Sequence, residues 1–104
     1  MRAEAIKGHV DLLVLSVLQR SPAHGYAVAE RLRKRSSGVF DLAEGTIYPA
    51  LYRLEGQGLV ESRWRTVGGR RRRVYRLTTA GEQALSGRRR HWDAFATAMQ
   101  AVLS

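Results

Sequence analysis

The chain has 104 residues, the size of one domain, and 44% of them are hydrophobic, so a wholly disordered protein is excluded. It has no cysteine, which excludes disulfides and thiolate-ligated zinc, and no apolar run long enough to span a bilayer. These absences favour a cytoplasmic protein with no membrane partner. Eighteen Lys and Arg oppose nine Asp and Glu, a formal charge of +9, so we also expect a polyanionic partner.

The first two predicted elements are helices. Residues 9–20 form a nearly continuous apolar run that is long for a strand, and the leucine content favours a helix buried on most sides. Pro22 ends this helix, because the residue before a proline is pushed out of the α region. A second helix is expected at about 25–35, with four basic residues toward its C-terminal end, where they complement the helix dipole.

A third helix is predicted at roughly 43–57 from an apolar stripe of helical period formed by Ile47, Ala50, Leu51 and Leu54. Pro49 lies inside this range, and proline is tolerated only in the first turn of a helix. We therefore expect either regular helix only from about Thr46, with Thr46 as the N-cap, or a bend near Gly45. The glycines of residues 56–58 should end the helix.

Two strands should follow, at 59–66 and 71–77, because side chains alternate there around a glycine-containing turn at 67–70. Seven arginines fall between Arg63 and Arg76 with no acidic residue among them. Guanidinium groups bind phosphate bidentately, which favours a nucleic-acid contact over a charge run that serves only solubility. Arg70 and Arg71 at the tip, with Arg72 beside them, are better candidates than Arg73, which shares a face with core candidates.

The last predicted element is a long helix at about 79–103. Thr78 or Thr79 should cap it, with Glu82 completing a capping box from Thr79. Its distal half carries an apolar stripe formed by Trp92, Phe95, Ala96, Met99, Val102 and Leu103. A monomer would expose too much of this stripe, so we expect it to pair with the same stripe, or with the first helix, of a second copy and form a homodimer. Packing back on its own domain is the alternative.

Three helices followed by a hairpin are typical of a winged helix-turn-helix, a mainly α fold with a small β-hairpin. Residues 1–78 would form the DNA-binding domain, and 79–104 a C-terminal dimerisation helix of the same compact unit. The third helix would lie in the major groove of double-stranded DNA, with the hairpin as the wing. The residues of the third helix that we expect to contact DNA are Thr46, Tyr48, Tyr52 and Arg53. Half-buried packing of the tyrosines and an ordinary surface role for Arg53 are the alternatives.

Three stretches, HGYAVAERL (24–32), GTIYPALYRLEGQGLVESRW (45–64) and RRRVYRLTTAGEQAL (71–85), resemble the PadR family of transcriptional regulators over nearly the whole chain. The resemblance implies a homodimer that represses transcription from a palindromic operator, and it corresponds to the short subfamily with one helix after the wing. It adds Pro49 to the DNA-reading helix. It also implies a planar aromatic effector held between subunits near Trp92 and Phe95, with plain dimer packing as the alternative.

Other classes of protein fit less well. His9, His24 and His91 are far apart without metal spacing, and no nucleophile elbow, phosphate loop or carboxylate pair occurs, so we expect no enzyme, metal or cofactor. A non-specific architectural nucleic-acid binder or an RNA binder stays open, because charge alone does not distinguish it from a repressor. A repressor should instead prefer one palindromic duplex strongly over random DNA.

Overall fold

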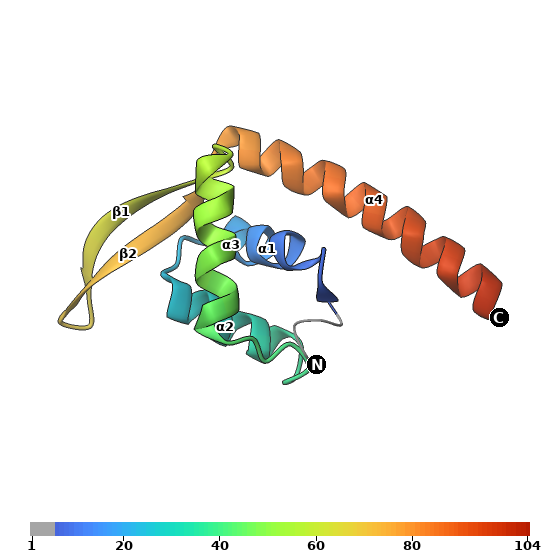
Figure 1. The fold of residues 1–104 in the computed structure, drawn as a ribbon, viewed down its shortest axis with the longest axis horizontal. Coiled ribbons are helices and arrows are strands. Elements are labelled where there is room, and N and C mark those ends of the chain that lie inside the picture. The colour runs from blue at the N-terminus through green and yellow to red at the C-terminus, as the bar shows by residue number, and fades with distance from the viewer. Residues whose placement is uncertain (1–5) are drawn as a thin grey trace.

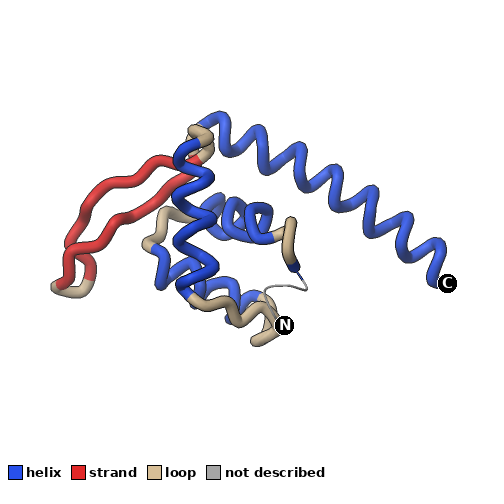
Figure 2. The backbone as a smooth tube through the Cα atoms, in the orientation of Figure 1, coloured by secondary structure: helices blue, strands red, loops and turns tan. Residues whose placement is uncertain are grey.

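The computed structural model describes residues 6–104, which form three helices, a β-hairpin and a long last helix. Figure 1 shows α3 crossing in front of α1, with the hairpin on its left, while α4 leaves the root of the hairpin and runs away from the body. Figure 2 shows the same division into helices and one two-stranded sheet. The elements are α1 (Val10–Arg20), α2 (Gly25–Arg35), α3 (Glu44–Gly56), β1 (Val60–Val67), β2 (Arg70–Leu77) and α4 (Thr79–Leu103).

One hydrophobic core joins the three helices to the root of the hairpin. The predicted stripe of α3 is fully buried and packs with the apolar residues of α1. Tyr75 of β2 and Leu85 of α4 close the core at 0% and 1% exposure, so both the wing and the start of α4 are fixed to the helical body. The other fully buried large side chains are Leu15, Ile47, Leu51, Leu54, Val14, Val17, Val28 and Val60.

The predicted range of 43–57 for the third helix agrees with α3 within one residue, but one of the two alternatives for its first turn does not hold. The helix begins at Glu44 after Ala43, and the amide of Thr46 already donates to the carbonyl of Ala43 at 2.9 Å. The expectation that regular helix starts only at Thr46, with Thr46 as the N-cap, is therefore wrong. Pro49 lies inside the helix, where its missing N–H would have bonded the carbonyl of Gly45. Gly45 is exposed, so water can satisfy that carbonyl.

The hairpin is antiparallel, with Val60 opposite Leu77 and Val67 opposite Arg70. Its two-residue turn has φ of 58° at Gly68 and 78° at Gly69, left-handed values that a tight hairpin turn requires. The predicted strands are thus correct within one residue. Ala23, in the linker between α1 and α2, bonds β2 through both backbone groups of Tyr75, at 3.0 and 2.9 Å. This bridge ties the linker to the wing.

Thr78 caps α4, because its hydroxyl accepts a hydrogen bond from the amide of Gly81 at 3.0 Å. Thr79 is the first helical residue, so the expected capping box from Thr79 to Glu82 is wrong. A Cβ at Gly81 would lie 1.9 Å from the carbonyl oxygen of Leu59, so only glycine permits this close approach. α4 therefore starts pressed against the root of the wing.

Candidate nucleic-acid interface

The outward surface of α3 carries two neighbouring tyrosines. Tyr52 is 58% exposed, and its ring centroid lies 6.1 Å from that of Tyr48. Tyr48 is half-buried because its ring packs against Gly25 at the start of α2, so packing does account for part of this side chain. Pro49 is exposed and Thr46 partly exposed beside them. Residues three and four apart share a helix face, so these four side chains form one continuous surface.

Arg53 also lies on the outward side of α3, beside α1. Its guanidinium makes two hydrogen bonds to Asp11 of α1, at 2.5 and 3.4 Å. The hydrogen bond and charge of Asp11 raise the pKa of Arg53 above its ordinary value. Asp11 also pairs with Arg88 of α4 at 3.5 Å, so one carboxylate links α3 and α4 through α1. Arg53 is thus already paired, unlike the tyrosines.

Two arginines of the wing, Arg71 and Arg73, have contacts that restrict their side chains. Arg73 donates to the hydroxyl of Ser62 at 2.7 Å and pairs with Glu55 of α3 at 3.7 Å, which fixes the wing to α3. The guanidinium groups of Arg71 and Arg73 lie 5.5 and 5.6 Å from the ring centroid of Trp64. The indole therefore restricts where Arg71 can point. Trp64 was not among the predicted site residues.

Arg72 points to the opposite face of the hairpin from Arg71, and its guanidinium lies 5.9 Å from the ring centroid of Tyr26 on α2. Tyr26 is 50% exposed and stacks on His24. His24 caps α2 by accepting the amide hydrogen of Ala27 at 3.3 Å. Burial and the charges of Arg72 and Arg31 lower the pKa of His24, so the neutral form that this cap needs is favoured.

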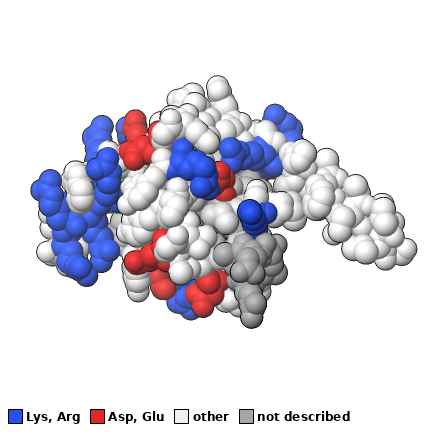
Figure 3. All heavy atoms as spheres, in the orientation of Figure 1, with Lys and Arg blue, Asp and Glu red and all other residues white. Residues whose placement is uncertain are grey.

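A groove of about 480 Å³ joins the two predicted halves of the interface. One wall is α3, with Tyr48 and Tyr52, and the other is the wing, whose lining residues include Trp64, Arg71 and Arg72. Figure 3 shows basic side chains gathered on the hairpin, whereas the distal part of α4 carries almost none in this view. The basic side chains of the hairpin thus create a positive field adjacent to the tyrosine surface of α3.

The distal stripe of α4 remains uncovered in the single chain. Trp92 and Phe95 are 42% and 49% exposed with ring centroids 5.8 Å apart, and Trp92 also meets the ring of His9 edge-on at 5.3 Å. Ala96 is partly buried. The remaining members of the stripe, Met99, Val102 and Leu103, are 45%, 84% and 75% exposed.

The described residues offer neither a cluster of metal ligands nor a membrane-spanning helix. In the described part of the chain, no group of three His, Cys, Asp or Glu side chains is placed to hold a metal ion. Within residues 6–104, none of the helices combines the length and apolar character that a bilayer crossing requires.

A helical unit with a recognition-type helix and a basic hairpin beside it defines a winged helix-turn-helix DNA-binding protein. The chain belongs to the PadR-like family of transcriptional regulators, whose family model matches residues 14–87. It is therefore a transcriptional regulator and not an enzyme, and the predicted fold class is confirmed.

Relatives of known name support this assignment. The transcriptional regulator Rv3488 of Mycobacterium tuberculosis is 41% identical over 81 residues, which cover 78% of this chain and 73% of that protein. A PadR family regulator from Clostridium difficile R20291 is 33% identical, with a TM-score of 0.82 over 92% of this chain and 99% of that one. Another, from Eggerthella lenta, is 34% identical, with a TM-score of 0.83 over 97% and 87%.

Proposed function

We propose that the chain is a cytoplasmic repressor that binds a palindromic DNA operator as a homodimer. The observation that carries the proposal is the shared groove, in which the tyrosines of α3 face the arginines of the wing. A major groove admits one helix, and a wing beside it can follow the adjoining backbone. A DNA duplex would then meet both walls at once.

The two walls have different roles in this proposal. On α3, Tyr52 and Pro49 contact base edges, Tyr48 is set in place by Gly25, and Thr46 contacts phosphate near the helix N-terminus. On the wing, Arg70, Arg71 and Arg72 contact phosphates and so position α3 without reading sequence. Arg53 is a weaker candidate for a DNA contact, because Asp11 already neutralises part of its charge.

The homodimer in this proposal forms through the distal half of α4. The half-exposed side chains of Trp92, Phe95 and Met99 form an apolar surface that a second copy would cover, with Val102 and Leu103 extending it. A two-fold axis between two α4 helices would place two α3 helices on two half-sites of a palindrome. Residues 79–104 would thus be the dimerisation segment of the compact unit.

A planar aromatic effector could bind beside Trp92 and Phe95, whose adjacent, half-exposed rings offer a stacking surface between subunits. Plain dimer packing is the competing role for both rings. Titrating planar aromatic compounds into wild type and Trp92→Phe, and following tryptophan fluorescence, separates the two roles. An identical response from both proteins would come from Trp64 alone and would rule the pocket out.

Selection of bound fragments from random duplex DNA tests the proposed function. We expect one enriched motif with two-fold symmetry, because two copies of α3 would read related half-sites. A pool without an enriched motif would favour a non-specific architectural nucleic-acid binder instead. Repeating the selection with Phe95→Glu should abolish the symmetry of the motif if α4 pairs the subunits.

A further inference from the structure

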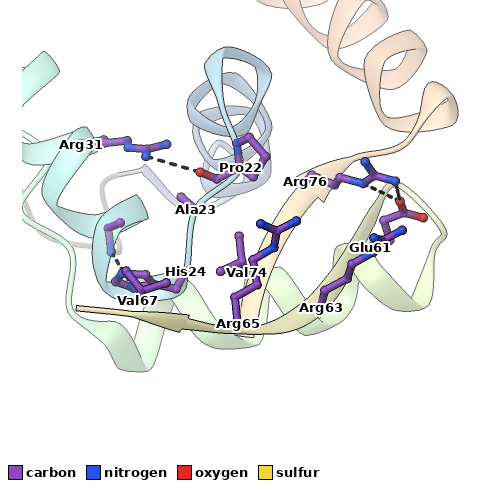
Figure 4. Close-up of a pocket in the computed structure, with 11 residues that line it drawn as sticks. Pro22, Ala23, His24, Arg31, Glu61, Arg63, Arg65, Val67, Val74 and Arg76 are labelled. Atoms are coloured by element: carbon purple, nitrogen blue, oxygen red, sulfur yellow. Dashed lines mark hydrogen bonds and ion pairs between the residues drawn. The ribbon is translucent and has the colours of Figure 1, made fainter. Parts of the chain in front are cut away.

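A second cleft, of about 540 Å³, lies on the face of the hairpin turned away from the groove with α3. Arg63 and Arg65 of β1 line it together with Arg31 of α2, and Figure 4 shows the two β1 side chains rising from the strand on the side of Val74 and the linker. The proposed DNA contacts of α3 and of the wing tip do not use these three arginines.

The charges in this cleft are strongly unbalanced. Its only carboxylate among the described lining residues is Glu61, and Glu61 is already paired with Arg76 at 2.5 Å. Neither Arg63 nor Arg65 has an acidic partner in the described part of the chain, and neither guanidinium donates a hydrogen bond there. Two guanidinium groups on one face of one strand therefore have their donors free for an outside acceptor.

The third guanidinium of the cleft, that of Arg31, is fixed by backbone carbonyls. Arg31 donates to the backbone carbonyls of Ser21 and Pro22, at 3.1 and 3.4 Å, which fixes it at the wall of the cleft opposite β1. Arg31 is one of the groups that lower the pKa of His24, another lining residue, so the wall is electropositive without a charged histidine. Apolar side chains also line the cleft, among them Ala23, Ala27, Val67 and Val74.

We propose that this cleft binds a phosphate-type oxyanion between α2 and the wing. Guanidinium forks match the oxygen geometry of phosphate, and charge-assisted hydrogen bonds are stronger beside apolar side chains than in water. An anion held by Arg31 on one side and by Arg63 and Arg65 on the other would add a link between α2 and β1 to the contacts that already join the wing to the helical body. The phosphate can be a free one or a group of the DNA backbone, and the two sources are distinguishable.

The first arm of the test uses pyrophosphate and no DNA, so its outcome does not depend on the proposed repressor function. Pyrophosphate is titrated at constant ionic strength by calorimetry and by fluorescence of Trp64 in a Trp92→Phe background, since Trp64 lies between Arg63 and Arg65 in β1. The test variant is Arg63→Gln with Arg65→Gln. The control, Arg20→Gln with Arg90→Gln, removes the same charge outside the cleft.

The second arm measures how the affinity for duplex DNA depends on salt in the same proteins. If free phosphate is the ligand, the test variant binds pyrophosphate about tenfold or more weakly than the control, and DNA affinity without pyrophosphate matches the control. If DNA phosphates fill the cleft, the salt slope of the test variant falls below that of the control by up to about two. Test and control variants that are equal in both arms would overturn the proposal.

Discussion

The ring of Tyr48 lies so close to Gly25 that a Cβ built at Gly25 would come within 2.4 Å of Cζ of that ring. The contact joins the first residue of α2 to the outward surface of α3. Only glycine at position 25 leaves space for the ring of Tyr48. The contact between the two residues therefore sets the direction in which the side chain of Tyr48 leaves α3. The second helix thereby sets the shape of the surface that we propose reads DNA.

Gly25→Ala should displace the ring of Tyr48, lower the free energy of unfolding by about 1–3 kcal/mol and weaken duplex binding, because a methyl group overfills the contact. Urea denaturation and DNA affinity measure both effects. In a Tyr48→Ala background the same Gly25→Ala change should cost little, because the clash partner is gone. An equal cost in both backgrounds would mean that Gly25 matters for another reason.

Arg70→Ala with Arg71→Ala should weaken binding about equally on all DNA sequences and reduce the salt slope by up to about two, because these groups would neutralise phosphates. Affinity measured over a range of salt concentrations, on two unrelated duplexes, checks this. Arg20→Ala with Arg90→Ala serves as the control for lost charge. A slope that does not change would show that the wing tip makes no phosphate contact.

Phe95→Glu should convert the dimer into a monomer, because the new carboxylate would lie inside the apolar contact between two α4 helices. Light scattering on a sizing column measures the mass directly. Thr97→Glu, on the exposed opposite side of α4, is the matched control and should remain dimeric. A Phe95→Glu protein with the same mass as wild type would place the subunit contact elsewhere.

Stability should fall below neutral pH through His24. The folded state lowers the pKa of His24, whereas the unfolded chain has an ordinary value of about 6.5, so the unfolded state binds more protons as the solution becomes acidic. The contribution of the neutral cap is therefore complete above that value and is lost as pH falls through the lower folded pKa. His24→Asn keeps a capping acceptor without a titration.

The measurement is the free energy of unfolding at pH 7.5 and pH 5.0 for both proteins. We expect a smaller loss on acidification for His24→Asn than for wild type. An equal loss would assign the effect to the other histidines or to the carboxylates.

Local sequence signals were enough to predict most of the fold. The apolar period of α3, the glycine turn of the hairpin and the stripe of α4 each act within a few residues, and each lies where it was expected. The alternative with regular helix only from Thr46 was wrong because Pro49 suggested a first-turn position, whereas an exposed Gly45 lets the helix tolerate proline five residues beyond its first residue, Glu44.

Contacts between distant elements could not be predicted in the same way. Arg53 and Asp11 are 42 residues apart, and their ion pair depends on how α1 and α3 cross. The placement of Arg71 and Arg73 beside Trp64 requires the register of the hairpin, which pairs Trp64 with Arg73. His24 and Tyr26 beside Arg72 depend on the bridge between Ala23 and Tyr75, for which nothing local in the sequence gives a signal.

Tyr52→Ala should change which sequences are preferred, at a cost of about 1–3 kcal/mol on the bases that it contacts. Affinities for the selected duplex and for its single-base variants measure this preference, and Tyr52→Phe separates the hydroxyl from the ring. A loss of the same size on every duplex would make Tyr52 a positioning residue.

In the proposed function, the surface of α3 recognises a particular DNA sequence. The most direct test is the ratio of the affinities of the wild-type protein for the selected duplex and for a scrambled duplex of the same composition, at one moderate salt concentration. We predict a ratio of at least about a thousand, the lower end for specific DNA binders. Equal affinity for the two duplexes would contradict the claim and leave only binding to the DNA backbone.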